Sequence, residues 1–140
     1  MEEICSKISP EKTICIIKRK NDAKDGRQDL TKDHEVLQVS LCNVNEGIVA
    51  KPHAHLLQSR TTEKTQESMV VVKGKMESTV YDLDHKTILG KFELEEGDCF
   101  IALNGGHSHK ALKNNTLFYE FKNGPYYGPE KDRKLIQNDS

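Results

Sequence analysis

The residues of this chain best suited to chemistry are four histidines arranged as two His-x-His pairs. His53 and His55 form the first pair, and His107 and His109 form the second. Residues i and i+2 of a strand point to the same face, so each pair can aim two imidazoles at one point. Glu67 starts a strand-like run and can bring a carboxylate to the same place. Three imidazole nitrogens and one carboxylate oxygen suit a divalent transition metal, so the pattern predicts a metal site.

We expect the metal ligands to be His53, His55 and Glu67, with a third imidazole from His107 or His109. His109 could replace His107 as a ligand, because both would face one way on a strand. Alternatively, His109 could act as a general base beside the metal and so be the catalytic residue. The ligand types fit several divalent ions, with iron, zinc and nickel as the leading candidates.

Three further residues are candidates for contact with a small-molecule ligand. Arg60 carries a planar guanidinium that matches a two-oxygen anion, and the alternative is a solvated loop arginine. Gln66 could hydrogen-bond a ligand, although on a strand it would face away from its neighbour Glu67. Tyr119 could stack on a sugar or instead pack against the rim of a barrel.

Length and charge restrict the class of protein. The 140 residues predict a single domain over 1–140, with a core at about 36–122 and a polar tail at 130–140. Lys and Arg total 21 against 22 Asp and Glu, so nothing attracts the whole chain to nucleic acid. No apolar run is long enough to span a membrane, and the start lacks the order of a signal peptide. We therefore expect a cytoplasmic protein.

The four cysteines show no Cys-x-x-Cys spacing, which excludes a zinc ribbon and a dithiol redox motif. Cys42 and Cys99 lie in apolar runs, where we expect them to be small core residues.

Hydrophobic alternation predicts strands, and we find no convincing helix. The expected strands are 4–6, 13–17, 36–44, 67–72, 76–83, 87–94, 99–103 and 116–122. The charged segment 18–32 is expected to be an exposed loop or hairpin tip. Short strands with a turn signal about every ten residues predict an all-β sandwich or barrel.

The first cluster resembles the first motif of the cupin superfamily, a group of small jelly-roll barrels. That motif reads Gly, five residues, His-x-His, a spacer, Glu, six residues and Gly, matched here by Gly47, His53, His55, Glu67 and Gly74. The spacer of eleven residues is longer than the three or four that are common in cupins.

The second cluster is similar to the second cupin motif. Gly97-Asp98 opens it, and His107 stands one residue before the usual place of the metal-binding histidine. The usual proline is replaced by Leu103.

A closer resemblance is to a subgroup of small bacterial cupins associated with surface-polysaccharide gene clusters. It rests on Thr65-Gln66-Glu67, on Gly105-Gly106-His107 and on Lys122 followed by Gly124-Pro125-Tyr126, and it spans about residues 36–134. The resemblance implies an all-β, double-stranded β-helix (jelly-roll) cupin barrel that binds a divalent metal. It also places the metal-binding histidine of the second cluster at His107, which makes His53, His55, Glu67 and His107 the expected ligands.

Three functions remain open at this stage. The first is a metal-dependent enzyme, an isomerase, epimerase or lyase, that acts on a small polar, carbohydrate-related metabolite. The second is an iron(II)-dependent dioxygenase, and the third is a non-catalytic module that binds a metabolite or a metal. In each case we expect a small-molecule ligand and a homodimer, since jelly-roll proteins often associate by strand exchange, and we expect neither nucleic acid nor a membrane as partner.

Overall fold

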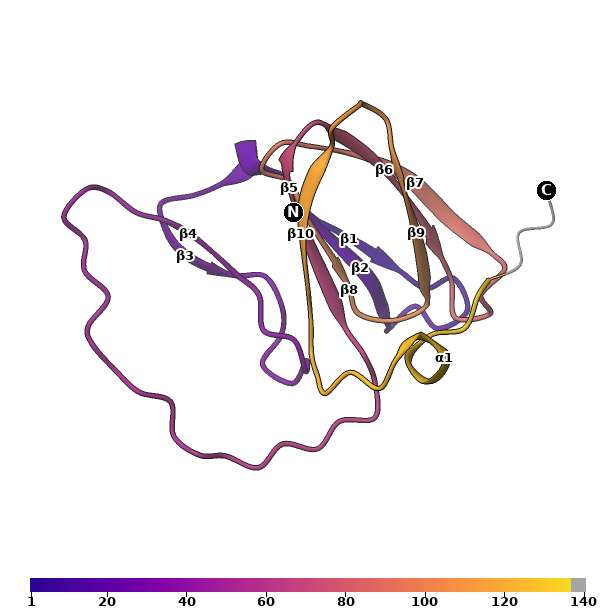
Figure 1. The fold of residues 1–140 in the computed structure, drawn as a ribbon, viewed down its shortest axis with the longest axis horizontal. Coiled ribbons are helices and arrows are strands. Elements are labelled where there is room, and N and C mark those ends of the chain that lie inside the picture. The colour runs from indigo at the N-terminus through magenta and orange to yellow at the C-terminus, as the bar shows by residue number, and fades with distance from the viewer. Residues whose placement is uncertain (137–140) are drawn as a thin grey trace.

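The computed structural model describes residues 1–136, and its regular structure is almost entirely antiparallel β-sheet (Figure 1). The strands are β1 (Glu2–Cys5), β2 (Thr13–Lys18), β3 (Gly26–Asp29), β4 (Ser40–Asn43), β5 (Glu67–Lys73), β6 (Lys75–Tyr81), β7 (Ile88–Glu95), β8 (Cys99–Ala102), β9 (Gly106–Ala111) and β10 (Leu117–Lys122). A 3₁₀ turn, η1 (Lys20–Asp22), and a four-residue helix, α1 (Pro129–Asp132), complete the described elements. The prediction of an all-β protein is confirmed.

The strands form three sheets. The largest has the order β1-β2-β8-β5-β10, the second has the order β7-β6-β9, and β3 pairs with β4 in a separate hairpin. The two larger sheets face each other, which is consistent with a β-sandwich, and the β3–β4 hairpin lies to one side (Figure 1). One edge of each larger sheet, β10 and β9 respectively, has no further strand paired to it among the described residues.

The main core fills the space between the two larger sheets, because alternate residues of each strand point inward. Its buried members are Ile14, Cys15, Ile17, Met69, Val71, Met76, Val80, Leu94, Phe100 and Ala102. A second apolar cluster covers the outer face of the five-stranded sheet and includes Ile16, Leu30, Cys99, Ile101 and Leu103. The core therefore begins before residue 36, with β2.

Most predicted strands agree with the structure to within a few residues, and three segments differ. The expected strand 36–44 shortens to β4. The charged segment 18–32 contains η1, β3 and three buried residues, Lys18, Leu30 and Thr31. Strand β9 was not among the predicted strands, because Gly-His-Ser-His-Lys lacks apolar alternation.

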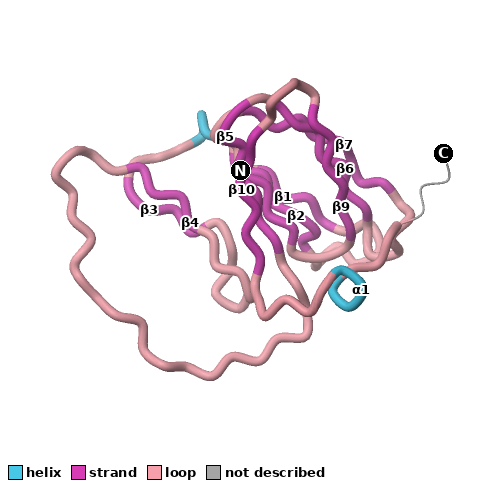
Figure 2. Tube along the Cα trace, in the orientation of Figure 1, coloured by secondary structure: helices cyan, strands magenta, loops and turns pink. Residues whose placement is uncertain are grey.

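A long exposed loop connects β4 to β5. Every residue from 42 to 65 is exposed, and the loop runs well away from the sheets before it returns to the start of β5 (Figure 2). At the other end of the chain, the predicted polar tail 130–140 contains most of α1, and residues 137–140 lie outside the described part.

The cysteines are all free thiols, but only one of the two expected core cysteines is buried. Cys99 is buried as predicted. Cys42 is exposed, because its position on the two-stranded hairpin leaves it uncovered, and Cys15 on β2 is buried instead. Among the described residues, no helix has the length and apolar character needed to cross a membrane.

Candidate metal centre

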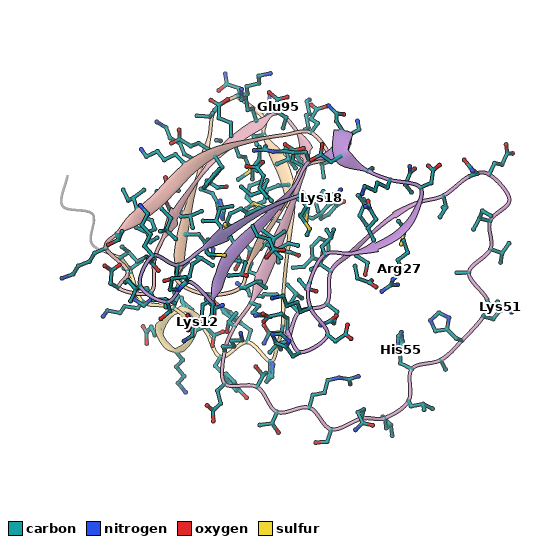
Figure 3. The ribbon with its side chains drawn as sticks, turned by 180° about the vertical axis from the view of Figure 1, so that it is seen from behind. Lys12, Lys18, Arg27, Lys51, His55 and Glu95 are labelled. Carbon is teal, nitrogen blue, oxygen red and sulfur yellow. The ribbon has the colours of Figure 1, made fainter. Side chains whose placement is uncertain are left out.

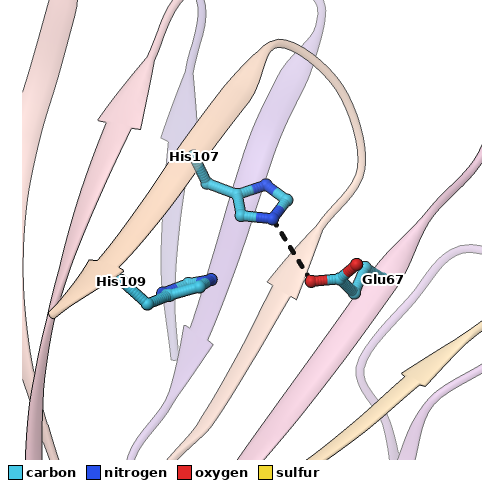
Figure 4. A group of neighbouring side chains, drawn as sticks. All are labelled: Glu67, His107 and His109. Atoms are coloured by element: carbon cyan, nitrogen blue, oxygen red, sulfur yellow. Dashed lines mark hydrogen bonds and ion pairs between the residues drawn. The ribbon is translucent and has the colours of Figure 1, made fainter. Parts of the chain in front are cut away.

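Three potential metal ligands meet between the two larger sheets: Glu67, His107 and His109 (Figure 4). Glu67 is the first residue of β5 and lies two positions before Met69, so its side chain is on the same core-facing side of the strand. In the register of β9 with β6, His107 lies opposite Val80, whose side chain is in the core, so both histidines also face inward. The two sheets therefore supply the carboxylate and the imidazoles from opposite sides.

The three ligand atoms are close enough to share one ion. They all lie within 4.8 Å of one another, and His107 Nε2 is 3.2 Å from Glu67 Oε1. A tetrahedral ion with bonds of about 2.1 Å separates its ligand atoms by roughly 3.4 Å. Small side-chain movements would thus bring all three to bonding distance, and the group could hold a metal ion.

His109 has one ring nitrogen in contact with the protein and one without a partner. Its Nδ1 lies 2.8 Å from Ser78 Oγ, and its Nε2 is buried and unpaired among the described residues. With the ring proton on Nδ1 and donated to Ser78, Nε2 keeps a lone pair directed at the cluster. Buried polar atoms almost always have a partner, so this nitrogen fits a bound ion.

The pKa values of His109 and Glu67 both lie below their ordinary values. Burial, reinforced by the charge that His107 carries whenever it is protonated, lowers the pKa of His109 to about 4 and keeps the His109 imidazole neutral at pH 7. Burial on its own would raise the pKa of Glu67, but the hydrogen bond with His107 and the charges of His107 and Lys122 bring the pKa below its ordinary value. A carboxylate and a neutral imidazole are the forms that bind metals.

Apolar packing encloses one side of the cluster. The ring of Phe100 is 1% exposed, and its centroid lies 5.9 Å from that of His107 and 5.2 Å from that of His109. On the other side, a cavity of about 570 Å³ opens to solvent, and Glu67, His107 and His109 are part of its lining. The cluster therefore has a closed apolar wall and one open approach.

Lys122 is the cross-strand neighbour of Glu67. The register of β10 with β5 pairs the two residues directly, and Lys122 Nζ lies 3.7 Å from Glu67 Oε2. Neither Lys122 nor Ser78 was predicted as a site residue. Lys122 is paired with Glu67 across β10 and β5, and Ser78 with His109 across β6 and β9. The sequence alone does not show which strands pair, so it could not place either residue beside the cluster.

The structure does not bring the first histidine pair to this cluster. His53 and His55 lie in the exposed loop between β4 and β5, with their ring centroids 5.4 Å apart. Figure 3 shows His55 on this loop, well away from the sheets. His53 Nδ1 is 2.9 Å from the carbonyl oxygen of Lys51. Of the four predicted ligands, Glu67 and His107 come together, and His109 is the third member of the group.

The three predicted ligand-contacting residues lie elsewhere as well. Arg60 is in the same exposed loop and donates to the carbonyl oxygen of Gln58. Gln66 is 1% exposed and faces away from Glu67, where its side chain hydrogen-bonds Glu35, Leu37 and Leu103. Tyr119 is 62% exposed and lies beside Phe121 on the outer face of β10.

Comparisons of the chain with protein-family models, with curated proteins and with solved structures give no significant match. The fold and the site therefore define this chain as an all-β protein with a Glu-His-His cluster that could hold a metal ion.

Proposed function

We propose that this chain is a cupin-type, metal-dependent enzyme in which Glu67, His107 and His109 bind a divalent transition metal. The observation that carries the proposal is the buried, unpaired Nε2 of His109, which lies within 4.8 Å of ligand atoms of the other two residues. Two nitrogens and one oxygen suit zinc, iron or nickel. In this assignment His109 is a ligand, which is one of the two roles that the sequence allows.

The surroundings of the cluster favour catalysis over a purely structural metal. Three protein ligands leave at least one coordination position open, whereas structural zinc sites are closed by four. The cluster lines a solvent-accessible cavity large enough for a small metabolite. A metal there would polarise a carbonyl or hydroxyl oxygen, as isomerases, epimerases and lyases of small polar, carbohydrate-related metabolites require.

His53 and His55 enter the proposal as further ligands that would arrive with the long loop. β9 is an edge strand with one unpaired side among the described residues, and it carries both histidines of the cluster. A segment around His53 and His55 that paired with this edge would place its imidazoles beside the cluster. The same pairing with the loop of a second copy would yield a strand-exchanged homodimer.

Metal content tests the proposal directly. We would purify the protein without a His tag, reconstitute it in turn with iron(II), zinc and nickel, and measure bound metal by plasma mass spectrometry. The wild type should bind close to one ion per chain, and Glu67→Gln and His109→Ala should each lose it. His34→Ala is the matched control, because His34 has a largely exposed side chain outside the cavity lining, and this variant should bind like the wild type.

The first histidine pair requires a separate comparison. If the loop supplies ligands, the double variant His53→Ala/His55→Ala should bind the metal more weakly while its circular dichroism stays unchanged. Full affinity in this variant would limit the site to the three clustered residues. Wild-type protein that takes up none of the three ions would refute the metalloenzyme proposal.

A further inference from the structure

The cavity beside the cluster changes its net charge when a metal binds. Among the described residues its lining carries three carboxylates, Glu67, Glu120 and Asp132, and three cationic side chains, Lys122, Arg133 and Lys134. These charges cancel, so a divalent cation would leave the cavity with an excess of about two positive charges. A cavity of this kind favours an anionic ligand over a neutral one.

Lys122 lines this cavity beside Glu67, and several contacts hold its ammonium group. Its Nζ lies 3.2 Å from Glu120 Oε1, 3.7 Å from Glu67 Oε2 and 5.3 Å from the ring centroid of Tyr126. An ion bound to Glu67 would take up much of the charge of that carboxylate. The ammonium group would stay paired with Glu120 but would lose its second anionic partner, so it could also pair with an oxyanion beside the metal.

Arg133 is an exposed residue that lines the same cavity from the C-terminal segment, and no hydrogen bond or ion pair engages its guanidinium among residues 1–136. The segment is docked against the site. A Cβ on Gly106, the residue before His107, would come within 2.4 Å of Ile136 Cδ1, so the glycine makes room for this side chain. Arg133 is therefore presented to the cavity by a segment that packs next to a metal-ligand candidate, not by a free tail.

We propose that the cavity binds a small molecule bearing a carboxylate or phosphate group, and that Lys122 and Arg133 hold this anion while the rest of the molecule reaches the metal. The inference rests on the proposed function, because it places the ligand in the cavity of the same metal centre. It replaces Arg60 with Arg133 as the residue that recognises the anion. A guanidinium suits this role because its paired N–H groups match two oxygens of either anion.

Isothermal titration calorimetry with defined probes tests the anion site. The carboxylate probe is glycolate and the phosphate probe is glycerol 2-phosphate, with glycolamide and glycerol as their uncharged counterparts. Each is titrated into zinc-loaded and metal-free protein whose metal content has been measured. At least one anionic probe should bind about tenfold or more tightly than its uncharged counterpart, and the stronger of the two identifies the kind of anion.

Variants assign the effect to residues. Arg133→Gln and Lys122→Gln should each weaken binding of the preferred anion by about tenfold, the lower end of what losing a charge-assisted hydrogen bond causes. Lys131→Gln is the matched control, because Lys131 lies on α1 outside the cavity lining and should have no effect. Equal affinity for charged and uncharged probes, or wild-type affinity in either cavity variant, would overturn the inference.

Failure of this inference can be told apart from failure of the proposed function. Protein that carries metal but shows no preference for anions keeps its metal centre and lacks the anion site. Protein that takes up no metal but binds an anion through Lys122 and Arg133 keeps the anion site and lacks the metal centre.

Discussion

The contact of Ser78 with His109 decides which nitrogen of this imidazole faces the cluster. Ser78 is fully buried on β6, and the β6–β9 register places it opposite His109, so its hydroxyl can hold the Nδ1 proton. Partners of this kind orient metal-binding imidazoles and make them better ligands. The contact would thus affect the affinity for a metal, although Ser78 is not itself one of the three candidate ligands.

We predict that Ser78→Ala weakens metal binding by 10- to 100-fold, the usual effect of removing such a partner. Ser108→Ala should leave the affinity unchanged, because Ser108 lies between the two histidines on β9 but is exposed. Competition with a chromophoric chelator measures both dissociation constants. Equal affinities in the two variants would show that Ser78 does not orient the ligand.

The lowered pKa of His109 predicts a pH-dependent stability of the metal-free protein. In the unfolded chain this imidazole titrates near 6.5, and in the folded protein near 4. Between these values the unfolded state binds more protons, so the free energy of unfolding falls as the pH drops from about 6.5 to about 4. The full shift corresponds to an upper limit of about 3 kcal/mol.

Urea denaturation at several pH values checks this prediction. His109→Gln removes the titrating group, so its stability should decline less than that of the wild type across the same interval. Parallel pH profiles of the two proteins would mean that His109 is not buried as a neutral imidazole.

At the scale of elements, the turn before β9 sets the position of both cluster histidines. Gly105 has φ +66°, and a Cβ there would lie 2.4 Å from the backbone oxygen of Tyr81. Glycine alone adopts this backbone at no cost and fits the space. The turn therefore places His107 two residues later at a defined point on the sheet.

We expect Gly105→Ala to destabilise the protein by roughly 2–4 kcal/mol, of which about 1 comes from the left-handed backbone and the rest from the clash. Gly26→Ala provides the control, since Gly26 has φ +85° with no atom within 4 Å of the added Cβ. It should cost only about 1 kcal/mol, the backbone contribution alone. Denaturant unfolding of both variants separates the two contributions, and equal losses would exclude the clash.

Strand periodicity explains which elements could be predicted from the sequence. Met69 to Val72 form an apolar run that predicts β5, and Glu67 then falls on the inward face with Met69. In β9 the residues that face the interior are polar, so the hydrophobic pattern is missing where the site is built. Gln66 follows the same alternation. It precedes Glu67, so its side chain faces the opposite side, where it accepts a hydrogen bond from the backbone N–H of Leu37 in the segment before β4.

The position of the first histidine pair could not be derived in this way. His53 and His55 alternate like strand residues, but the preceding residue, Pro52, lacks the N–H that a central strand requires, which restricts this segment to the edge of a sheet. In the structure the whole of 42–65 is exposed and contains no strand partner for either histidine among the described residues. The spacing along the chain predicted that both histidine pairs meet Glu67. In the structure only the second pair does so, because the pairing of β9 with β6 brings His107 and His109 to Glu67.

At the scale of the whole molecule, the two apolar clusters divide the cysteines into two classes. Cys15 and Cys99 are buried, and burial raises the pKa of the first thiol to about 12 and of the second to about 11. Cys5 and Cys42 are exposed. Thiols react as thiolates, so the buried pair should be inert in the native state.

We predict that native protein reacts rapidly with a thiol reagent such as DTNB at two cysteines and at the other two only on global unfolding. Cys5→Ser/Cys42→Ser should abolish the fast phase and leave the slow one. The rate of the slow phase should follow the unfolding rate as urea is added. A third fast thiol in the wild type would mean that one of the clusters is open in solution.

The two sheets contribute the metal-ligand candidates from opposite sides, Glu67 from β5 and both histidines from β9. An ion in the proposed centre would therefore act as a cross-link through the sandwich, and the sheets could not separate without releasing it. At a free metal concentration 100 times the dissociation constant, this linkage adds about 2.7 kcal/mol to the free energy of unfolding. In a cell, the abundance of the protein would then follow the supply of its metal, because chains that lack the ion unfold more often and are degraded first.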